Sequence, residues 1–172
     1  MSPPTGGQSI CDGDAADVAA QLGRPLRGRA SVAHRCPCGA VDVVATAPRL
    51  DDGTPFPTTY YLTCPRATAA VSTLESEGVM REYTERLATE PDLAEAYRVA
   101  HQEYLRARDE LAQAWQLEVP EIDGVSAGGM PDRAKCLHVL VAHSLAAGPG
   151  VNPLGDDALD RLPRWWAKGR CV

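Results

Sequence analysis

The chain has few aromatic residues and no long apolar run. Aromatic residues make up 5% of its 172 residues, with a single phenylalanine, and no apolar stretch approaches the ~20 residues that a membrane-spanning helix needs. The first seven residues have neither the basic region nor the apolar core of a secretory signal peptide. We therefore expect a protein without a membrane span, in the cytoplasm.

An excess of positive charge is also lacking. The sequence has 17 Lys and Arg against 23 Asp and Glu, a formal net charge of -6. Because nucleic acids and anionic membrane surfaces attract basic proteins, this balance argues against both as general partners. No Walker A or Gly-x-Gly-x-x-Gly pattern is present, so no nucleotide site is predicted.

Length and patterning predict one α+β domain. We expect a disordered lead-in over 1–11, a single domain over 12–163 and a C-terminal tail over 164–172. After a short helix at 15–22, β-branched runs predict strands at 30–35, 41–47 and 58–63. Apolar periodicity then predicts helices at 65–77, 79–88, 91–117, 131–146 and 156–162. The fold class is a small, mostly antiparallel three-stranded sheet followed by, and packed against, about five helices.

Six cysteines in a reducing compartment indicate thiols or metal ligands rather than disulfides. Cys36-Pro37-Cys38-Gly39 is one residue short of a zinc-ribbon knuckle. With one residue between them, both sulfurs reach one ion only under strain, so we expect one ligand here. Cys11 and Cys171 lie near the ends, and we expect exposed thiols outside the site.

A third thiol, Cys64, directly precedes Pro65, a residue suited to the first helical position. Cys64 is thereby predicted as the N-cap, where the helix dipole and free N–H groups favour a thiolate. Arg66 adds positive charge beside it.

The helix expected at 131–146 carries a thiol and two imidazoles, at Cys136, His138 and His143. Cys136 and His143 share a face but stand ~10 Å apart, too far for an easy pair on one ion. His138 points away from Cys136 if the helix is regular. Each imidazole is either close to a metal or a core histidine with a hydrogen-bond partner.

We expect these segments to converge on one soft metal centre. Cys36, Cys64 and Cys136 would be ligands, and Cys38, His138 or His143 would complete or support the shell. Thiolates select zinc or an iron–sulfur cluster, and spacing alone does not separate zinc from a [4Fe-4S] cluster. The metal-free alternative is a thiol enzyme with Cys64 or Cys136 as nucleophile and a histidine base.

Basic residues near glycine-rich loops predict a small anionic ligand beside the thiols, held by Arg66, Arg133 and Lys135. Tight turns with solvated basic neighbours are the alternative. Another basic segment, broken by glycine and containing Arg24, Arg27 and Arg29, is either a solvated loop or a small anion-binding arm.

Several motifs together resemble an uncharacterised bacterial family, the domain of unknown function 501, of the actinobacterial type. They are Arg35-Cys36-Pro37-Cys38-Gly39, Asp52-Gly53-Thr54-Pro55-Phe56-Pro57-Thr58, Tyr61-Leu62-Thr63-Cys64-Pro65, Leu74-Glu75, Lys135-Cys136-Leu137-His138, Ala142-His143 and Asn152-Pro153-Leu154-Gly155. The resemblance covers about residues 15–160 and implies no assigned activity. It implies Cys36, Cys64 and Cys136 as the central set, since the Cys38 position varies in distant members.

The genetic neighbourhood that this resemblance implies, beside exopolyphosphatase and septum-formation genes, suggests a third hypothesis. In it the chain is an interaction protein of cell division or polyphosphate metabolism. Its binding surface would be the long helix at 91–117 and the C-terminal tail with Trp165 and Trp166.

Overall fold

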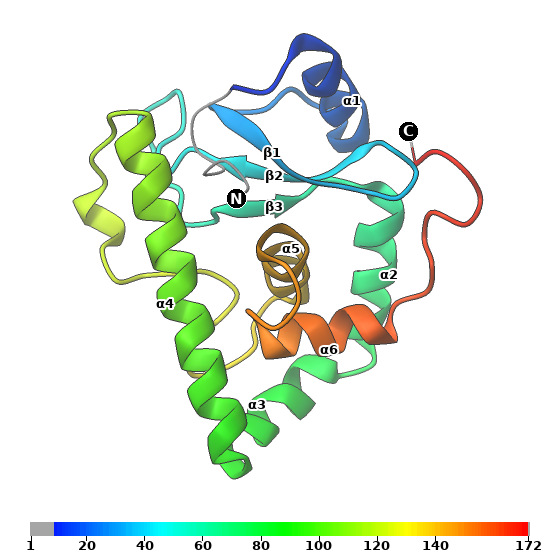
Figure 1. The fold of residues 1–172 in the computed structure, drawn as a ribbon, viewed down its shortest axis with the longest axis vertical. Coiled ribbons are helices and arrows are strands. Elements are labelled where there is room, and N and C mark those ends of the chain that lie inside the picture. Colours follow the sequence, from blue (N-terminus) through cyan, green and yellow to red (C-terminus); the bar gives the residue numbers. More distant parts are fainter. Residues whose placement is uncertain (1–8, 172) are drawn as a thin grey trace.

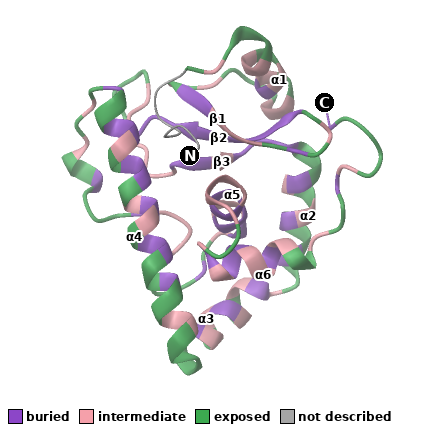
Figure 2. Ribbon diagram, in the orientation of Figure 1, coloured by how far each residue is buried: buried purple, intermediate pink, exposed green. Residues whose placement is uncertain are grey.

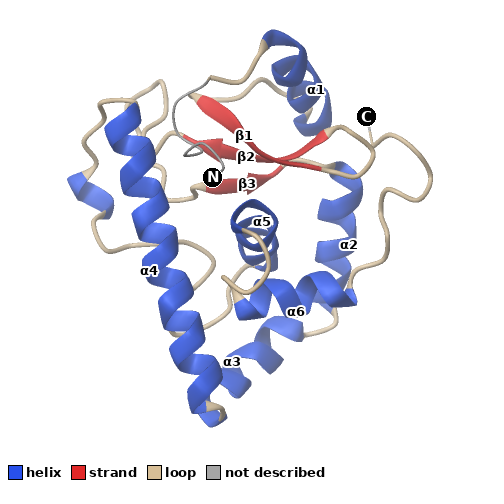
Figure 3. Cartoon of the chain, viewed as in Figure 1, coloured by secondary structure: helices blue, strands red, loops and turns tan. Residues whose placement is uncertain are grey.

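The computed structural model describes residues 9–171 as a three-stranded antiparallel sheet combined with six α-helices (Figure 1). The sheet order is β1-β2-β3. In chain order the elements are α1 (Asp12–Leu22), β1 (Ala30–Arg35), β2 (Val41–Thr46), β3 (Tyr60–Leu62), α2 (Pro65–Ser76), α3 (Val79–Thr89), α4 (Pro91–Ala114), the 3-10 helix η1 (Pro120–Ile122), α5 (Leu137–Ala147) and α6 (Pro153–Arg161). The predicted α+β class, with five helices after the sheet, is confirmed (Figure 3).

The first hairpin is built by β-branched strands and a tight turn. Residues Ala30 to Arg35 pair with Thr46 to Val41, with an irregular register around His34. The turn closes when the Gly39 N–H donates to the Cys36 carbonyl at 2.8 Å, and Gly39 has a φ of 91° that favours glycine. This turn places two cysteines at one end of the sheet.

Helices cover both faces of the sheet, and β2 is buried along its whole length (Figure 2). Val41 and Val44 pack toward Val18 of α1 in a small separate cluster, and the irregular register around His34 allows these two residues, three positions apart, to share a face. Val43 and Ala45 belong to the main core. The main core also takes in the buried faces of α2 to α6, so one hydrophobic centre joins the sheet to most helices.

The helix α5 lies in the middle of the molecule, beneath β3, with α2 beside it and α6 below it (Figure 1). It begins at Leu137, so the prediction of a helix from residue 131 is wrong at its start. Residues 131–136 form turns, because the Arg133 and Lys135 N–H groups bond back to the carbonyls of Gly129 and Gly128. Cys136 therefore caps the helix instead of lying inside it.

The long helix α4 packs its predicted apolar stripe into the core. Tyr97, Ala100, Tyr104, Ala107 and Leu111 are all buried. The segment after α6 also lies against the main core, through the buried side chains of Trp165 and Cys171. Trp166 is half-buried and meets Trp165 edge to face. Within residues 9–171, no helix combines the length and the apolar character needed to cross a membrane.

Candidate metal centre

Three cysteines from opposite ends of the sequence meet beside the first hairpin. The sulfur atoms of Cys36, Cys38 and Cys171 all lie within 4.8 Å of one another, so both cysteines of the hairpin turn join the group, where their spacing had predicted only one. The Cys36 and Cys171 sulfurs are 3.9 Å apart although the residues are separated by 135 positions. Both of these side chains are buried, and Cys38 is half-buried. A thiol cluster of this kind has the donor set of a soft metal site.

A fourth thiol adjoins this group. Cys64 is fully buried at the N-cap of α2, as predicted from Pro65, and its thiol lies close enough to Cys171 to raise the pKa of that residue. The set whose sulfurs all lie within 4.8 Å does not include Cys64. We call Cys36, Cys38, Cys64 and Cys171 the cysteine cluster.

The thiols of the cysteine cluster differ in acidity. Burial, followed by bonding to Cys38 and the charge of Cys64, raises the pKa of Cys171 far above its ordinary value. Burial also raises the pKa of Cys36. At Cys38 burial acts in the same direction, but N–H groups of Ala40 and Cys171 outweigh it and lower the pKa. Adjacent thiolates repel one another, so several of them ionise together only if a cation binds between them.

Polar contacts hold the C-terminal segment over the cysteine cluster. The guanidinium of Arg66, at the start of α2, donates to the Gly169 carbonyl at 2.9 Å. Two residues before the end, Arg170 pairs with Asp17 of α1 at 2.6 Å. Cys171 is therefore positioned by contacts to two different helices.

A second group of metal-type ligands lies at the start of α5. Cys136, His138 and Glu75 each place one ligand atom within 4.8 Å of the others. Nδ1 of His138 is 3.9 Å from the Cys136 sulfur and 3.2 Å from Glu75 Oε1. The same carboxylate oxygen accepts the Leu137 N–H at 2.8 Å, and Nε2 of His138 lies 3.2 Å from the Thr68 carbonyl. These contacts fix the imidazole on both sides.

The thiol and the imidazole of this second group change each other's acidity. The hydrogen bond with Cys136, opposed by burial and supported by the charge of Glu75, raises the pKa of His138 to about 9. Burial acts to raise the pKa of Cys136, but the bond to His138 and the Val139 N–H outweigh it and lower the pKa. Each group therefore favours the charged form of the other, a thiolate beside an imidazolium.

The two groups stand at opposite ends of α2. Cys64 caps the start of the helix and Glu75 lies in its last turn, 11 positions further on, which corresponds to about 16 Å at 1.5 Å per residue. The structure thus places Cys36 and Cys64 in one group and Cys136 in another.

The second imidazole, His143, belongs to the core. Its side chain is fully buried, stacks on Tyr60 and meets Tyr104 edge to face. Asn152 Nδ2 lies 3.1 Å from its Nδ1, and burial lowers its pKa to about 4. His143 is a neutral packing residue, the second of the two roles open to it from sequence.

The cations predicted to hold an anion lie apart from the pocket that the structure shows. Arg66 bonds to the C-terminal segment, and Arg133 and Lys135 are exposed on the turns before α5. The pocket is lined instead by residues of the segment between α1 and β1, including Arg24 and Arg27.

Sequence reasoning missed two residues of these groups. The expectation of an exposed Cys171 is wrong, because its thiol is buried against Cys36; Cys11, by contrast, is exposed as expected. Glu75 appeared in the sequence analysis only as part of a motif of the family resemblance. Its position in the sequence does not predict that it lies beside Cys136. Both residues join the groups through contacts distant in sequence.

Comparison with known proteins shows the family of this chain. The family model described as "Protein of unknown function (DUF501)" matches residues 32–160, three quarters of the chain. The chain belongs to the DUF501 family. No curated protein and no solved structure matched it. The part that matches the DUF501 model contains Cys36, Cys38, Cys64 and Cys136 and ends before Cys171.

Proposed function

We propose that the chain is a zinc-binding protein whose cysteine cluster holds one ion. The observation that carries this proposal is the spacing of the three sulfurs, two of them 3.9 Å apart and all within 4.8 Å. With Zn–S bonds of about 2.3 Å, the sulfurs of a tetrahedral site lie about 3.8 Å apart. Cys64 supplies the fourth thiolate through a small shift of its side chain toward Cys171.

The same spacing favours one metal ion over an iron–sulfur cluster. In a [4Fe-4S] cluster each cysteine binds a different iron, which places the sulfurs farther apart than around a single ion. Zinc also agrees with a set of four thiolates, the donor type of closed structural sites. All six cysteines are free, which fits the reducing conditions of the cytoplasm, where we place the protein.

The role of this zinc is to join separate parts of the fold. The ligands come from the hairpin turn, from the N-cap of α2 and from the segment after α6. The N–H groups of Ala40 and Cys171 that bond to the Cys38 sulfur support a thiolate, as backbone amides do in zinc knuckles. A closed site of four protein ligands stabilises the fold and leaves no position for a substrate.

Metal content of the protein purified under reducing conditions tests this proposal. We expect about one zinc and no iron per chain, by elemental analysis. Cys171→Ser should retain less than about a tenth of the zinc, because loss of one thiolate opens the site. Cys11→Ser is the matched control, since the Cys11 thiol is exposed and donates to Asp14, away from the cysteine cluster, and this variant should keep the full amount. Iron in place of zinc, or full zinc in Cys171→Ser, would contradict the assignment.

A second candidate function rests on the contact between Cys136 and His138. The Cys136 sulfur accepts a hydrogen bond from the Val139 N–H at the start of α5. It also faces the imidazole of His138, which Glu75 and Thr68 hold in place. These are the parts of an activated nucleophile: a thiolate, its partner base and groups that orient the base. We infer that Cys136 attacks small electrophiles, forming a thioether or thioester as the leaving group departs.

The rate of alkylation by iodoacetamide measures this reactivity. In the wild-type protein Cys136 should react at pH 7 about tenfold faster than in His138→Gln, because the imidazolium lowers the pKa of the thiol. The difference should shrink as the pH rises through about 9, where His138 loses its proton. Mass spectrometry of the modified peptide separates Cys136 from the other thiols.

Ser72→Ala is the matched control for that measurement. Its hydroxyl lies 3.3 Å from Nε2 of His138, on the side of the ring away from the thiol, and its removal should leave the rate within about twofold. Equal rates in the wild-type protein and in His138→Gln across the pH range would exclude the ion pair as the cause of reactivity.

A further inference from the structure

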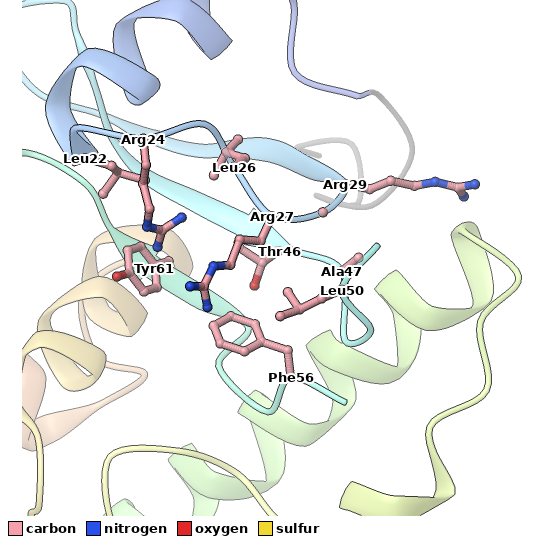
Figure 4. A pocket seen from close by; sticks show the side chains of 11 residues that line it. Leu22, Arg24, Leu26, Arg27, Arg29, Thr46, Ala47, Leu50, Phe56 and Tyr61 are labelled. Atoms are coloured by element: carbon pink, nitrogen blue, oxygen red, sulfur yellow. The ribbon is translucent and has the colours of Figure 1, made fainter. Parts of the chain in front are cut away.

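A pocket of about 190 Å³ opens between the segment that joins α1 to β1 and the edge of the sheet (Figure 4). Its lining comes from three parts of the chain: residues 22–29, the end of β2 with the loop that follows it, and Tyr61 of β3. None of these residues belongs to the cysteine cluster or to the group around Cys136, so the pocket is a separate site.

Much of the lining is apolar. Leu22, Leu26, Leu50, Phe56 and Tyr61 contribute side chains, and all five are only partly buried. Phe56 is the single phenylalanine of the sequence, and the fold places it at this opening instead of in the core. Because these apolar side chains remain partly exposed in the pocket, they favour a ligand with an apolar body.

Positive charge gathers at the same opening, and among residues 9–171 no carboxylate lines the pocket. Figure 4 shows the side chains of Arg24 and Arg27 extending toward the rings of Tyr61 and Phe56, whereas Arg29 extends away from them. Arg24 donates to the Pro25 carbonyl at 3.1 Å and Arg29 to the Trp115 carbonyl at 3.4 Å. The charge of Arg27 acts on Asp52 without an ion pair between them.

These three arginines differ from most others in the chain. Within residues 9–171 none of the three forms a salt bridge, although the protein is acidic overall. Salt bridges are formed by Arg35, Arg49, Arg81, Arg86, Arg98, Arg106, Arg161 and Arg170. The guanidinium groups of Arg24 and Arg27, which have no carboxylate partner and extend toward the aromatic rings of the pocket, are free to form bidentate bonds with the oxygens of an incoming anion.

We propose that this pocket binds a small organic anion, with a ring-sized apolar body against Phe56 and Tyr61 and an anionic head between Arg24 and Arg27. Its volume sets the size of the body, because a cavity of about 150 Å³ accepts benzene and this one has room for a carboxylate or phosphate as well. A whole nucleotide exceeds that space. The ligand class is therefore an aromatic or short-chain carboxylate or phosphate monoester.

A titration followed by amide NMR tests the proposal, with phenyl phosphate and benzoate as the two anionic probes. We expect saturable shifts confined to residues 22–29, 46–56 and 61, with at least one probe binding with a Kd below about 1 mM. Benzyl alcohol, which has the ring but no charge, and inorganic phosphate, which has the charge but no ring, should each bind at least tenfold more weakly. The stronger of the two anionic probes identifies the head group.

Two arginine variants with the same change of charge make the test specific. Arg27→Gln should raise the Kd of the more tightly bound anionic probe at least tenfold. Arg29→Gln should change the Kd of the same probe by less than about twofold, because Arg29 extends away from the rings. Arg27 is exposed, so the spectrum of its variant should show an intact fold. Equal weakening by both variants, equal binding of inorganic phosphate, or no shifts with either anionic probe would overturn the proposal. Each outcome is independent of zinc at the cysteine cluster.

Discussion

Removal of zinc should lower the free energy of unfolding by about 4 kcal/mol, compared with the protein in free zinc at about a thousand times the Kd. The reason is that the folded chain brings the four thiols together and the unfolded chain does not, so binding energy adds to folding energy. Urea unfolding of the wild-type protein with and without a chelator, followed by circular dichroism, measures the difference. The domain keeps its hydrophobic core without metal, so we expect a less stable fold and not complete unfolding.

Variants separate a zinc effect from a general effect of the chelator. The stability of Cys171→Ser should be low in both conditions and should not respond to the chelator, whereas Cys11→Ser should behave as the wild-type protein. If chelation leaves the urea midpoint of the wild-type protein unchanged, zinc has no structural role in this chain. A midpoint that falls equally in the wild-type protein and in Cys171→Ser would assign the effect to another metal site.

The second large effect is expected at the contact between α5 and α6, where Gly155→Ala should cost about 3 kcal/mol of stability. A methyl group on Gly155 would overlap the Leu140 carbonyl oxygen and the Ser144 hydroxyl. The carbonyl belongs to the backbone of α5 and cannot turn aside, so the two helices must separate. This separation would also disturb the bond from the Gly155 N–H to Asn152, 3.0 Å long, that caps α6.

Gly13→Ala provides the matched control for Gly155→Ala. Gly13 also lies in a helix, α1, but a methyl group there meets no atom within 4 Å. Alanine is the better helix former, so this variant should be unchanged or up to about 1 kcal/mol more stable. Urea denaturation of both variants gives the comparison, and a Gly155→Ala protein of wild-type stability would show that α6 packs less closely against α5.

The fold could largely be predicted because its signals are local. The valines of β2, the prolines that begin α2 and α4 and the glycine after α1 each mark an element through nearby residues. The start of α5 could not be placed, because the bonds that hold residues 131–136 in turns run back to Gly128 and Gly129. Proline at position 131 favours a first helical turn, but these loop contacts outweigh it.

The candidate sites were predictable only in part. The N-cap position of Cys64 follows from the proline beside it, and pairing of Cys136 with His138 was among the alternatives for a thiol enzyme. The grouping itself depends on tertiary contacts: Cys171 reaches Cys36 across most of the chain, and Glu75 reaches residues 137 and 138 from α2. A sequence pattern alone does not show which residues far apart in the chain lie close together in space.

The contact between Cys36 and Cys171 joins two points that are 135 positions apart in the chain. An ion bound to both residues closes a ring that contains β2, β3, α2 to α6 and nearly all of the main core. A protease that cuts one exposed loop within this ring would leave both pieces attached through the metal. Degradation of the folded protein would then require either two cuts or loss of the ion, and the supply of zinc would set its lifetime.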